Sequence, residues 1–442
     1  MNDKNFIPAY YKAHGLEARW VALTMLGAIL IEKKSLAELK QNRSHYFSSL
    51  LPEQKARTLS ILEGVLRNLS MLDSIISIYV NKKPSIKILN VLRVAAAEIF
   101  VDNIASHAVV DSAVRLTKND RKLSKYCGFI NAVCRNIANK ANDDNIIWKP
   151  MLSTNLLTVF EDIYGIEVSK KFSASQARRP PIDITVKNDN LIAKYAKILD
   201  GQILASGSLR LRNKKKVSGL EGFEKGDWWV QDFSASLPAR LFGDVKNSRV
   251  LDVCAAPGGK TMQLVSYGAD VTAIEISRKR ADRLQSNLAR TKLNATIIVD
   301  DIMCYWPTEK FDFILVDPPC TSTGTIRRNF DLQYLNPTKR LPFLVKKQKE
   351  ILEKCMELLN KSGKLIFCTC SLLPQEGEKL VSEVIDKYKG WIQVPIKLEN
   401  IGIDRKWLDT SGGLRLRPDY WEEIGGMDGF YIAVIMRRSS DP

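Results

Sequence analysis

The sequence L-D-V-C-A-A-P-G-G-K-T at residues 251–261 decides the fold of the larger part of this 442-residue chain. Its first residues complete an apolar run from Arg249 to Val253, which predicts a buried strand. Gly258 and Gly259 let the backbone approach a ligand closely, and a helix is expected to begin there. A strand, a glycine loop and a helix in this order indicate a ligand site at the carboxyl end of a parallel strand.

Apolar segments of strand length recur after this loop. They cover residues 270–274, 295–299, 311–316, 364–370 and 430–436, with helical stretches between them. Apolar strands that alternate with helices are typical of a doubly wound, mostly parallel sheet. Residues 239–442 are therefore predicted to form an α/β, Rossmann-like domain.

The first third of the chain has a different pattern. In residues 1–145, apolar residues recur at helical spacing, as at Leu62, Leu66 and Leu69, and glycine is sparse. This pattern predicts an all-α domain. The polar run N-D-D-N at 142–145 marks its end.

Residues 146–238 are predicted to form a small mixed α/β segment that connects the two domains. A helix is expected at 156–164 and a short strand at 182–186. The basic run at 210–216 is interpreted either as a solvated loop or as a loop that faces RNA.

The charge of the chain favours a polyanionic partner. The formal net charge is +17, and the isoelectric point is about 9.4. Residues 1–150 hold 22 Lys and Arg against 13 Asp and Glu, which places a net charge of +9 on one third of the chain. Nucleic acid is the first candidate partner.

The sequence indicates a reduced, cytoplasmic setting. No apolar signal segment follows the polar start, and the longest apolar stretch, 21–31, is too short to span a membrane. The eight cysteines form no disulfide framework. Free thiols are therefore available for chemistry.

Histidine is confined to the first third, at His14, His45 and His107. A histidine-dependent hydrolase or a histidine-rich metal site is thus excluded from residue 151 onward. Chemistry in that part must use Cys, Asp, Glu, Lys or a cofactor.

Several ligands compete for the glycine loop. A phosphate-binding P-loop needs glycine at position 254, where Cys254 stands, and the dinucleotide pattern G-x-G-x-x-G is absent. Glu275 ends the next predicted strand, where an acid can hold ribose hydroxyls. Asp301, with Asp300 as the competing choice, follows the third strand and can meet an adenine edge. S-adenosylmethionine fits best, and a corner without any ligand is the structural alternative.

Two cysteines follow neighbouring predicted strands. Cys320 comes directly after Asp317-Pro318-Pro319, and Cys370 ends the strand 364–370. A thiolate that adds to C6 of a pyrimidine makes C5 nucleophilic enough to accept a methyl group. A second group must then remove the C5 proton before the thiol can leave. Asp317 could hold the N3/amino edge of the base and supply a proton there.

Structural explanations compete with this chemistry. A lone buried cysteine is usually a small hydrophobic residue, and Cys134, Cys304 and Cys355 are interpreted in this way. Cys368 and Cys370 could instead bind zinc or form a disulfide. This is disfavoured because the C-terminal part has no C-x-x-C motif and no histidine.

Five motifs resemble known families. L-D-V-C-A-A-P-G-G-K-T, D-P-P-C-T-S-T-G-T-I-R-R from residue 317 and F-C-T-C-S-L-L-P-Q-E-G-E from residue 367 resemble the RNA cytosine-C5 methyltransferases. I-A-S-H-A-V-V from residue 104 and G-F-I-N-A-V-C-R-N from residue 128 resemble NusB-type RNA-binding domains. The combination is similar to the bacterial members of the family that act on 16S ribosomal RNA.

The resemblance implies a role for each motif. Cys370 would be the nucleophile, Cys320 would assist release, and Asp317 would take part in catalysis. Ribosomal RNA would be the substrate of a cytoplasmic monomer, with no metal and no membrane. S-adenosylmethionine would be held by residues Cys254, Ala255, Ala256, Pro257, Gly258, Gly259, Lys260, Glu275, Asp301 and Asp317.

Two other functions are considered. An amino-group RNA methylase would carry an aromatic residue where Cys320 stands, which disfavours it. An RNA-binding or transcription-termination factor with a vestigial methyltransferase domain is disfavoured by the intact loop and by both cysteines.

Overall fold

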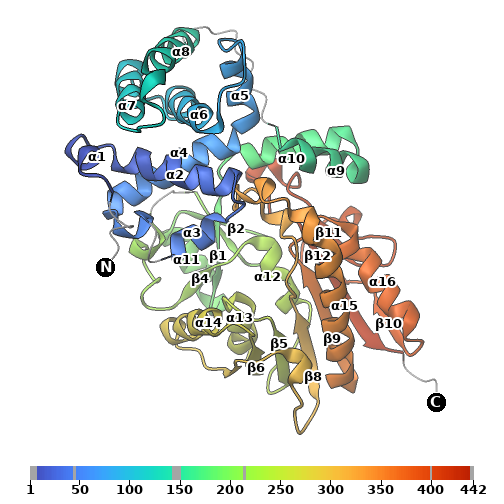
Figure 1. Ribbon diagram of the computed structural model, residues 1–442. Coiled ribbons are helices and arrows are strands. Elements are labelled where there is room, and N and C mark those ends of the chain that lie inside the picture. The colour runs from blue at the N-terminus through green and yellow to red at the C-terminus, as the bar shows by residue number, and fades with distance from the viewer. Residues whose placement is uncertain (1–6, 43–45, 142–150, 213–215, 399–400, 439–442) are drawn as a thin grey trace. The chain divides into compact units, whose positions relative to one another are not determined.

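The computed structural model describes residues 7–42, 46–141, 151–212, 216–398 and 401–438. The chain divides into two compact units. The helical unit comprises Met1–Arg178 and Arg328–Pro337, and the sheet unit comprises Arg179–Arg327 and Thr338–Pro442. Figure 1 labels the elements of both. Across the described residues, no helix is long and apolar enough to cross a membrane.

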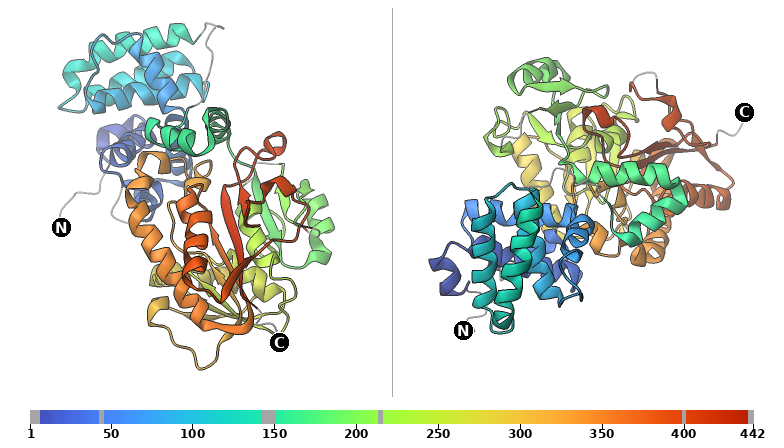
Figure 2. Two further views of the ribbon diagram at one scale, coloured as in Figure 1. Left: turned by 90° about the vertical axis from the view of Figure 1, so that its right-hand side faces the viewer. Right: turned by 90° about the horizontal axis from the view of Figure 1, so that it is seen from above.

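The helical unit confirms the predicted all-α class of the N-terminal part. Amphipathic helices between residues 9 and 140 bury their leucine, isoleucine and valine faces in one core, which includes Leu62, Leu66 and Leu92, and the last two helices of the unit pack on each other through Phe160 and Phe172. These helices are blue to green in Figure 2. They are α1 (Ala9–Ala13), α2 (Glu17–Leu30), α3 (Leu36–Gln41), α4 (Pro52–Arg67), α5 (Leu69–Ser77), α6 (Ile86–Phe100), α7 (Ser106–Lys118), α8 (Cys127–Lys140), α9 (Thr154–Tyr164) and α10 (Ile166–Ala177).

A distant segment completes the helical unit. Phe330 and Tyr334 are buried in its core. The Asp331 carboxylate accepts a 2.7 Å hydrogen bond from the backbone N–H of Leu36. The Tyr334 hydroxyl donates a 2.7 Å hydrogen bond to the carbonyl of Leu66. The predicted boundary at 142–145 lies outside the described residues, and the domain limits of the sequence analysis stay predictions.

The sheet unit begins with a small antiparallel sheet of order β2-β3-β1-β4. Its core is formed by side chains such as Ile184, Leu209 and Trp228. The predicted strand at 182–186 is present. The elements are β1 (Ile182–Val186), α11 (Ile192–Ile198), β2 (Gly201–Ile203), β3 (Leu209–Leu211) and β4 (Trp228–Val230).

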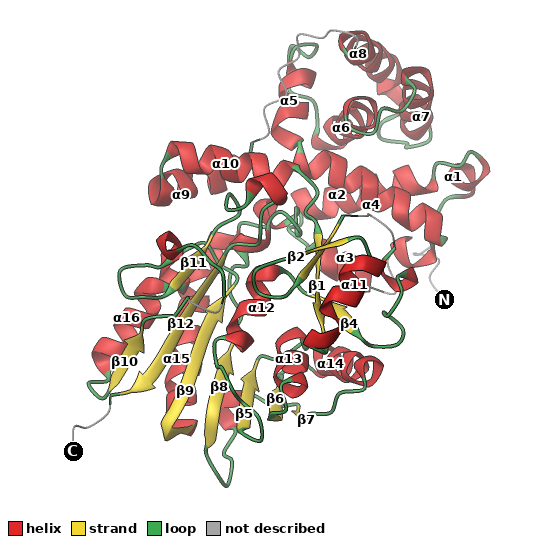
Figure 3. Cartoon of the chain, turned by 180° about the vertical axis from the view of Figure 1, so that it is seen from behind, coloured by secondary structure: helices red, strands yellow, loops and turns green. Residues whose placement is uncertain are grey.

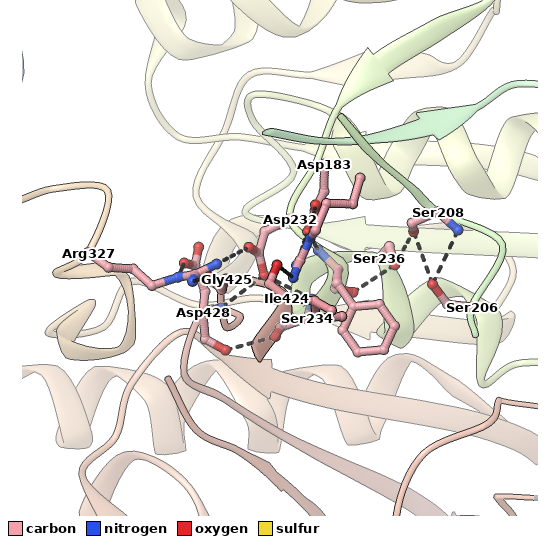
Figure 4. A network of polar contacts seen from close by, with 12 residues as sticks. Asp183, Ser206, Ser208, Asp232, Ser234, Ser236, Arg327, Ile424, Gly425 and Asp428 are labelled. Carbon is pink, nitrogen blue, oxygen red and sulfur yellow. Dashed lines mark hydrogen bonds and ion pairs between the residues drawn. The ribbon is translucent and has the colours of Figure 1, made fainter. Parts of the chain in front are cut away.

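Arg210 corrects the interpretation of the basic run 210–216. It lies in β3, is buried, and forms a bidentate ion pair with Asp183, with both N···O distances at 2.8 Å. A second buried arginine, Arg327, bridges Asp232 and Asp428, and Figure 4 shows these three residues together with Asp183. Residues 213–215 lie outside the described residues.

Arg210→Met is expected to destabilise the sheet unit by about 3–5 kcal/mol, because it leaves the buried Asp183 carboxylate without its cation. The measurement is chemical denaturation of the full chain. Arg212→Met is the matched control, since Arg212 is two residues away and its side chain is 68% exposed. Equal stability of the two variants would contradict this account of Arg210.

The large sheet has the order β10-β12-β9-β8-β5-β6-β7, with β11 paired to β12 (Figure 3). Strands β5 to β9 run parallel to one another, whereas β12 pairs antiparallel with β9, β10 and β11. The predicted α/β class is confirmed. The strands are β5 (Arg249–Val253), β6 (Asp270–Ile274), β7 (Thr296–Ile298), β8 (Phe311–Val316), β9 (Leu359–Thr369), β10 (Trp391–Val394), β11 (Leu414–Leu416) and β12 (Phe430–Arg437).

Helices cover both faces of this sheet. Leu237 of α12 (Phe233–Arg240) and Leu264 of α13 (Gly259–Ser266) pack on one face, in a core with Ile366. α14 (Arg278–Thr291) contributes Leu284 to a smaller adjoining cluster. The opposite face packs against α15 (Leu341–Leu358) and α16 (Glu378–Lys387). Because β5, β6, β7, β8 and β9 run parallel, the residues that follow them lie together at the carboxyl ends of the strands.

Candidate active site

The glycine loop has a fixed shape between β5 and α13. Cys254 adopts a left-handed conformation, with φ of 62°, and its neighbour Ala255 donates a 3.1 Å hydrogen bond to the carbonyl of Ile274. Gly258 has φ of 103°, and a Cβ there would lie 2.3 Å from Cδ1 of Leu284. Glycine is therefore required at 258. α13 begins at the next residue, so its first backbone N–H groups face the loop.

Glu275 lies at the end of β6 and is 1% exposed. One carboxylate oxygen accepts a 3.1 Å hydrogen bond from the Ser277 N–H. The other accepts a 3.4 Å hydrogen bond from the Ala256 N–H and lies 3.2 Å from Nη2 of Arg280. Glu275 thus also holds the glycine loop, a contact that the sequence analysis did not predict.

The two acids after β7 differ in their surroundings. Asp301 accepts a 3.1 Å hydrogen bond from the Met303 N–H and so caps the short helix Ile302–Cys304. Asp300 is exposed and accepts a 2.7 Å hydrogen bond from the Asp301 N–H. Part of the Asp301 carboxylate is thus used in a local turn.

Lys260 and Asp317 form an ion pair beside the thiols. Nζ of Lys260, in the first turn of α13, lies 2.6 Å from Oδ2 of Asp317, which directly follows β8. Burial is the largest single influence and lowers the pKa of Lys260, but the charge of Asp317 and the hydrogen bond to it, with the charges of Cys368 and Asp252, together raise the pKa above its ordinary value. Lys260 is therefore charged. The sequence analysis placed Lys260 in the cofactor loop and did not predict this pair.

The structure brings the two predicted catalytic cysteines together. Sγ of Cys320 lies 3.4 Å from Sγ of Cys370, and both thiols are free and partly exposed. A hydrogen bond to Cys370, burial, and the charges of Cys370, Glu376 and Asp317 raise the pKa of Cys320. The raised pKa favours the protonated form of Cys320, and either thiol can donate in this contact.

Backbone contacts hold the two cysteine loops in register. The Gly324 N–H donates a 3.0 Å hydrogen bond to the carbonyl of Cys370. A Cβ at Gly324 would lie 2.0 Å from the carbonyl oxygen of Gly429, so only glycine fits. Arg415 donates to the carbonyl of Ser371 and pairs with Glu378. Contacts of the Cys320 loop and of the Cys370 loop thus together fix the 3.4 Å distance between the two Sγ atoms.

The other cysteines are divided. Cys134 and Cys355 are buried, as predicted, but Cys304 is exposed, so its interpretation as a core residue is wrong. It lies in a short helix outside the packed strands, where a small apolar residue need not be buried. Cys368 is buried in the core beside α12. Among the described residues, no group of His, Cys, Asp and Glu could hold a metal ion.

Comparisons with known proteins identify the family. A family model described as "16S rRNA methyltransferase RsmB/F" matches residues 240–436, and the NusB family model matches 16–139. Ribosomal RNA small subunit methyltransferase B of Photorhabdus laumondii is 30% identical over 431 residues, covering 91% of this chain and 94% of that protein. The chain belongs to this methyltransferase family. The Pasteurella multocida relative of the same name is 29% identical, covering 96% of each chain.

Family membership establishes the activity class. The chain is an S-adenosylmethionine-dependent ribosomal RNA methyltransferase with a NusB-type helical domain. Solved structures share the fold. "Crystal Structure of PH0851" superposes with a TM-score of 0.71 at 20% identity, covering 98% of this chain and 100% of that one. The crystal structure of NSun6 from Pyrococcus horikoshii with SFG superposes with a TM-score of 0.55 at 18% identity, covering 65% of this chain and 99% of that one.

Proposed function

We propose that this methyltransferase modifies C5 of a cytosine in 16S ribosomal RNA through a covalent bond between Cys370 Sγ and C6. The observation that carries the proposal is the pair of thiols 3.4 Å apart at the ends of two adjacent parallel strands. An amino-group methylase needs no thiol, whereas an attack at C6 followed by proton removal at C5 needs two groups that reach adjacent ring atoms.

The residues at the sheet edge fit S-adenosylmethionine. The loop 254–260 offers backbone N–H groups at the start of α13 for a carboxylate, and Gly258 brings the backbone close. Glu275 and Asp301 would hold the ribose hydroxyls and the adenine edge. The bound cofactor supplies the methyl group. Lys260, paired with Asp317, would hold that carboxylate against the base.

The chain's own residues carry the other steps. The Cys370 thiolate adds to C6, and Asp317 holds the N3/amino edge while electron density moves to C5. Once Cys370 is bonded to carbon, its negative charge and its hydrogen bond to Cys320 are gone. These are two of the causes that raise the pKa of Cys320, so the pKa falls at this stage. Cys320 then loses its proton to water and takes the C5 proton, and the C6–S bond breaks.

The experiment that tests the proposed function is nucleoside analysis of 16S ribosomal RNA. RNA from cells that lack the protein, incubated with it and with S-adenosylmethionine, should gain 5-methylcytosine at one position. N4-methylcytosine would overturn the proposal and favour the amino-group methylase. The cytoplasmic location and the monomeric state stay predictions.

Glu275→Gln is expected to raise the cofactor KM by about 10-fold or more, with a much smaller change in kcat. The substitution weakens hydrogen bonds both to the ribose and to the loop, but it leaves the thiols in place. Steady-state kinetics with saturating RNA measures it. Glu309→Gln, with the side chain 75% exposed, is the control. A fall in kcat at unchanged KM would show that this role of Glu275 is wrong.

A further inference from the structure

Glu376 is a buried carboxylate beside both cysteine loops. It lies six residues after Cys370 and is 0% exposed. Its carboxylate oxygens lie 2.9 and 3.2 Å from the backbone nitrogen of Thr321, and one of them accepts a hydrogen bond from the Thr321 hydroxyl. Nε2 of Gln348 donates a further bond of 2.9 Å. All of its partners are neutral donors.

These bonds hold both neighbours of Cys320. Thr321 follows Cys320 and is bonded by Glu376 directly. Pro319 precedes it, and its carbonyl accepts a 2.9 Å hydrogen bond from Nε2 of Gln348. One carboxylate and one amide thus fix the backbone on either side of the Cys320 thiol.

The loop of Cys370 depends on other groups. Its carbonyl is held by Gly324, and the carbonyl of Ser371 is held by Arg415. The Thr369 hydroxyl donates a 2.8 Å hydrogen bond to the backbone carbonyl of Glu376, which a side-chain substitution leaves intact. The Glu376 side chain therefore binds the Cys320 loop directly and reaches the Cys370 loop only through the Thr321 hydroxyl, which lies 3.1 Å from the Ser371 hydroxyl.

Burying the Glu376 carboxylate has an unfavourable desolvation free energy. In the described part of the chain, no lysine or arginine forms an ion pair with Glu376, and burying a charge without a counter-ion costs several kcal/mol. A carboxylate accepts on both oxygens, so it can bind three converging donors that an apolar residue would leave unsatisfied.

We propose that Glu376 is a positioning residue for the release step: it holds Cys320 where the thiol can reach the C5 proton of the adduct on Cys370. The inference rests on the proposed function, because it assigns a residue to one step of the covalent mechanism. It assigns Gln348 to the same task through Pro319.

Glu376→Leu provides the test. Multiple-turnover methylation of 16S ribosomal RNA should fall by about 10²-fold, the cost of an ångström-scale misplacement of a reacting group. The first transfer in a single turnover should stay within about twofold of wild type. A protein–RNA adduct that survives denaturing electrophoresis should accumulate. Loss of folding would instead lower both rates together and give no adduct.

Three further variants sharpen the test. Glu376→Gln keeps one acceptor for Thr321 and Gln348 and should restore most of the turnover. Gln348→Leu releases Pro319 and should also accumulate adduct, which keeps the proposal testable if Glu376→Leu does not fold. Glu383→Leu is the matched control, because Glu383 lies on α16 with its side chain 59% exposed.

Two failures can be told apart. If Cys320→Ala accumulates adduct but Glu376→Leu and Gln348→Leu turn over normally, the positioning role is overturned and the covalent mechanism stands. If Cys320→Ala gives no adduct either, the proposed function fails, and the inference fails with it.

Discussion

Cys320→Ala is expected to trap the enzyme on its RNA. Without the thiol, the C5 proton of the methylated adduct stays in place, so the bond between Cys370 and C6 cannot break. One methyl group should be transferred per protein, and turnover should then fall by about 10²–10⁴-fold, as for the loss of a general base. Denaturing electrophoresis with labelled S-adenosylmethionine measures both the adduct and its methyl group.

Cys370→Ala is the counterpart and should differ in kind. It removes the group that attacks C6, so both methylation and the adduct should fall to background. Cys304→Ala is the matched control, because Cys304 is an exposed free cysteine. If Cys370→Ala accumulates adduct and Cys320→Ala does not, the two roles are exchanged.

Asp317→Asn is expected to lower kcat by about 10²–10⁴-fold even at saturating cofactor. The substitution keeps the size of the side chain but removes the charge that pairs with Lys260 at 2.6 Å. It also replaces a carboxylate, which can only accept a hydrogen bond from the cytosine amino group, by an amide that can donate as well as accept. Steady-state kinetics with both substrates saturating provides the measurement.

The control for Asp317 is Asp282→Asn on α14, where the side chain is 68% exposed. If Asp317→Asn keeps the wild-type kcat and only raises the cofactor KM, Asp317 acts in cofactor binding and not in the chemical step. Lys260→Met should reproduce much of the Asp317→Asn effect, because either change breaks the same ion pair.

The parallel strands of the large sheet could be predicted closely from the sequence, whereas β10 and β11 were not predicted. β5 and β8 match the expected segments residue for residue, and β6 does too. Strands buried on both faces are continuous apolar runs bounded by polar residues. The sequence therefore indicates both where such a strand lies and where it ends. The two thiols could be placed together for the same reason, because the ends of neighbouring parallel strands meet.

Contacts between distant segments could not be predicted. Arg210 was predicted to lie in a basic loop. Its burial depends on the ion pair with Asp183, which lies 27 residues earlier in the chain. Phe330 and Tyr334 follow the Cys320 motif yet complete the helical core. Glu376 lies within the motif that begins at Phe367, but its partners Thr321 and Gln348 come from other elements. Local periodicity carries no information on such pairs.

The measurement that tests the central claim most directly uses RNA that contains 5-fluorocytosine. After methyl transfer, C5 carries fluorine and a methyl group, so no proton can be removed and the thiol cannot leave. Wild-type enzyme should form a stable adduct only with S-adenosylmethionine present. Peptide mapping should place a methylated, fluorinated pyrimidine on Cys370. An adduct on Cys320, or no adduct at all, would contradict the account.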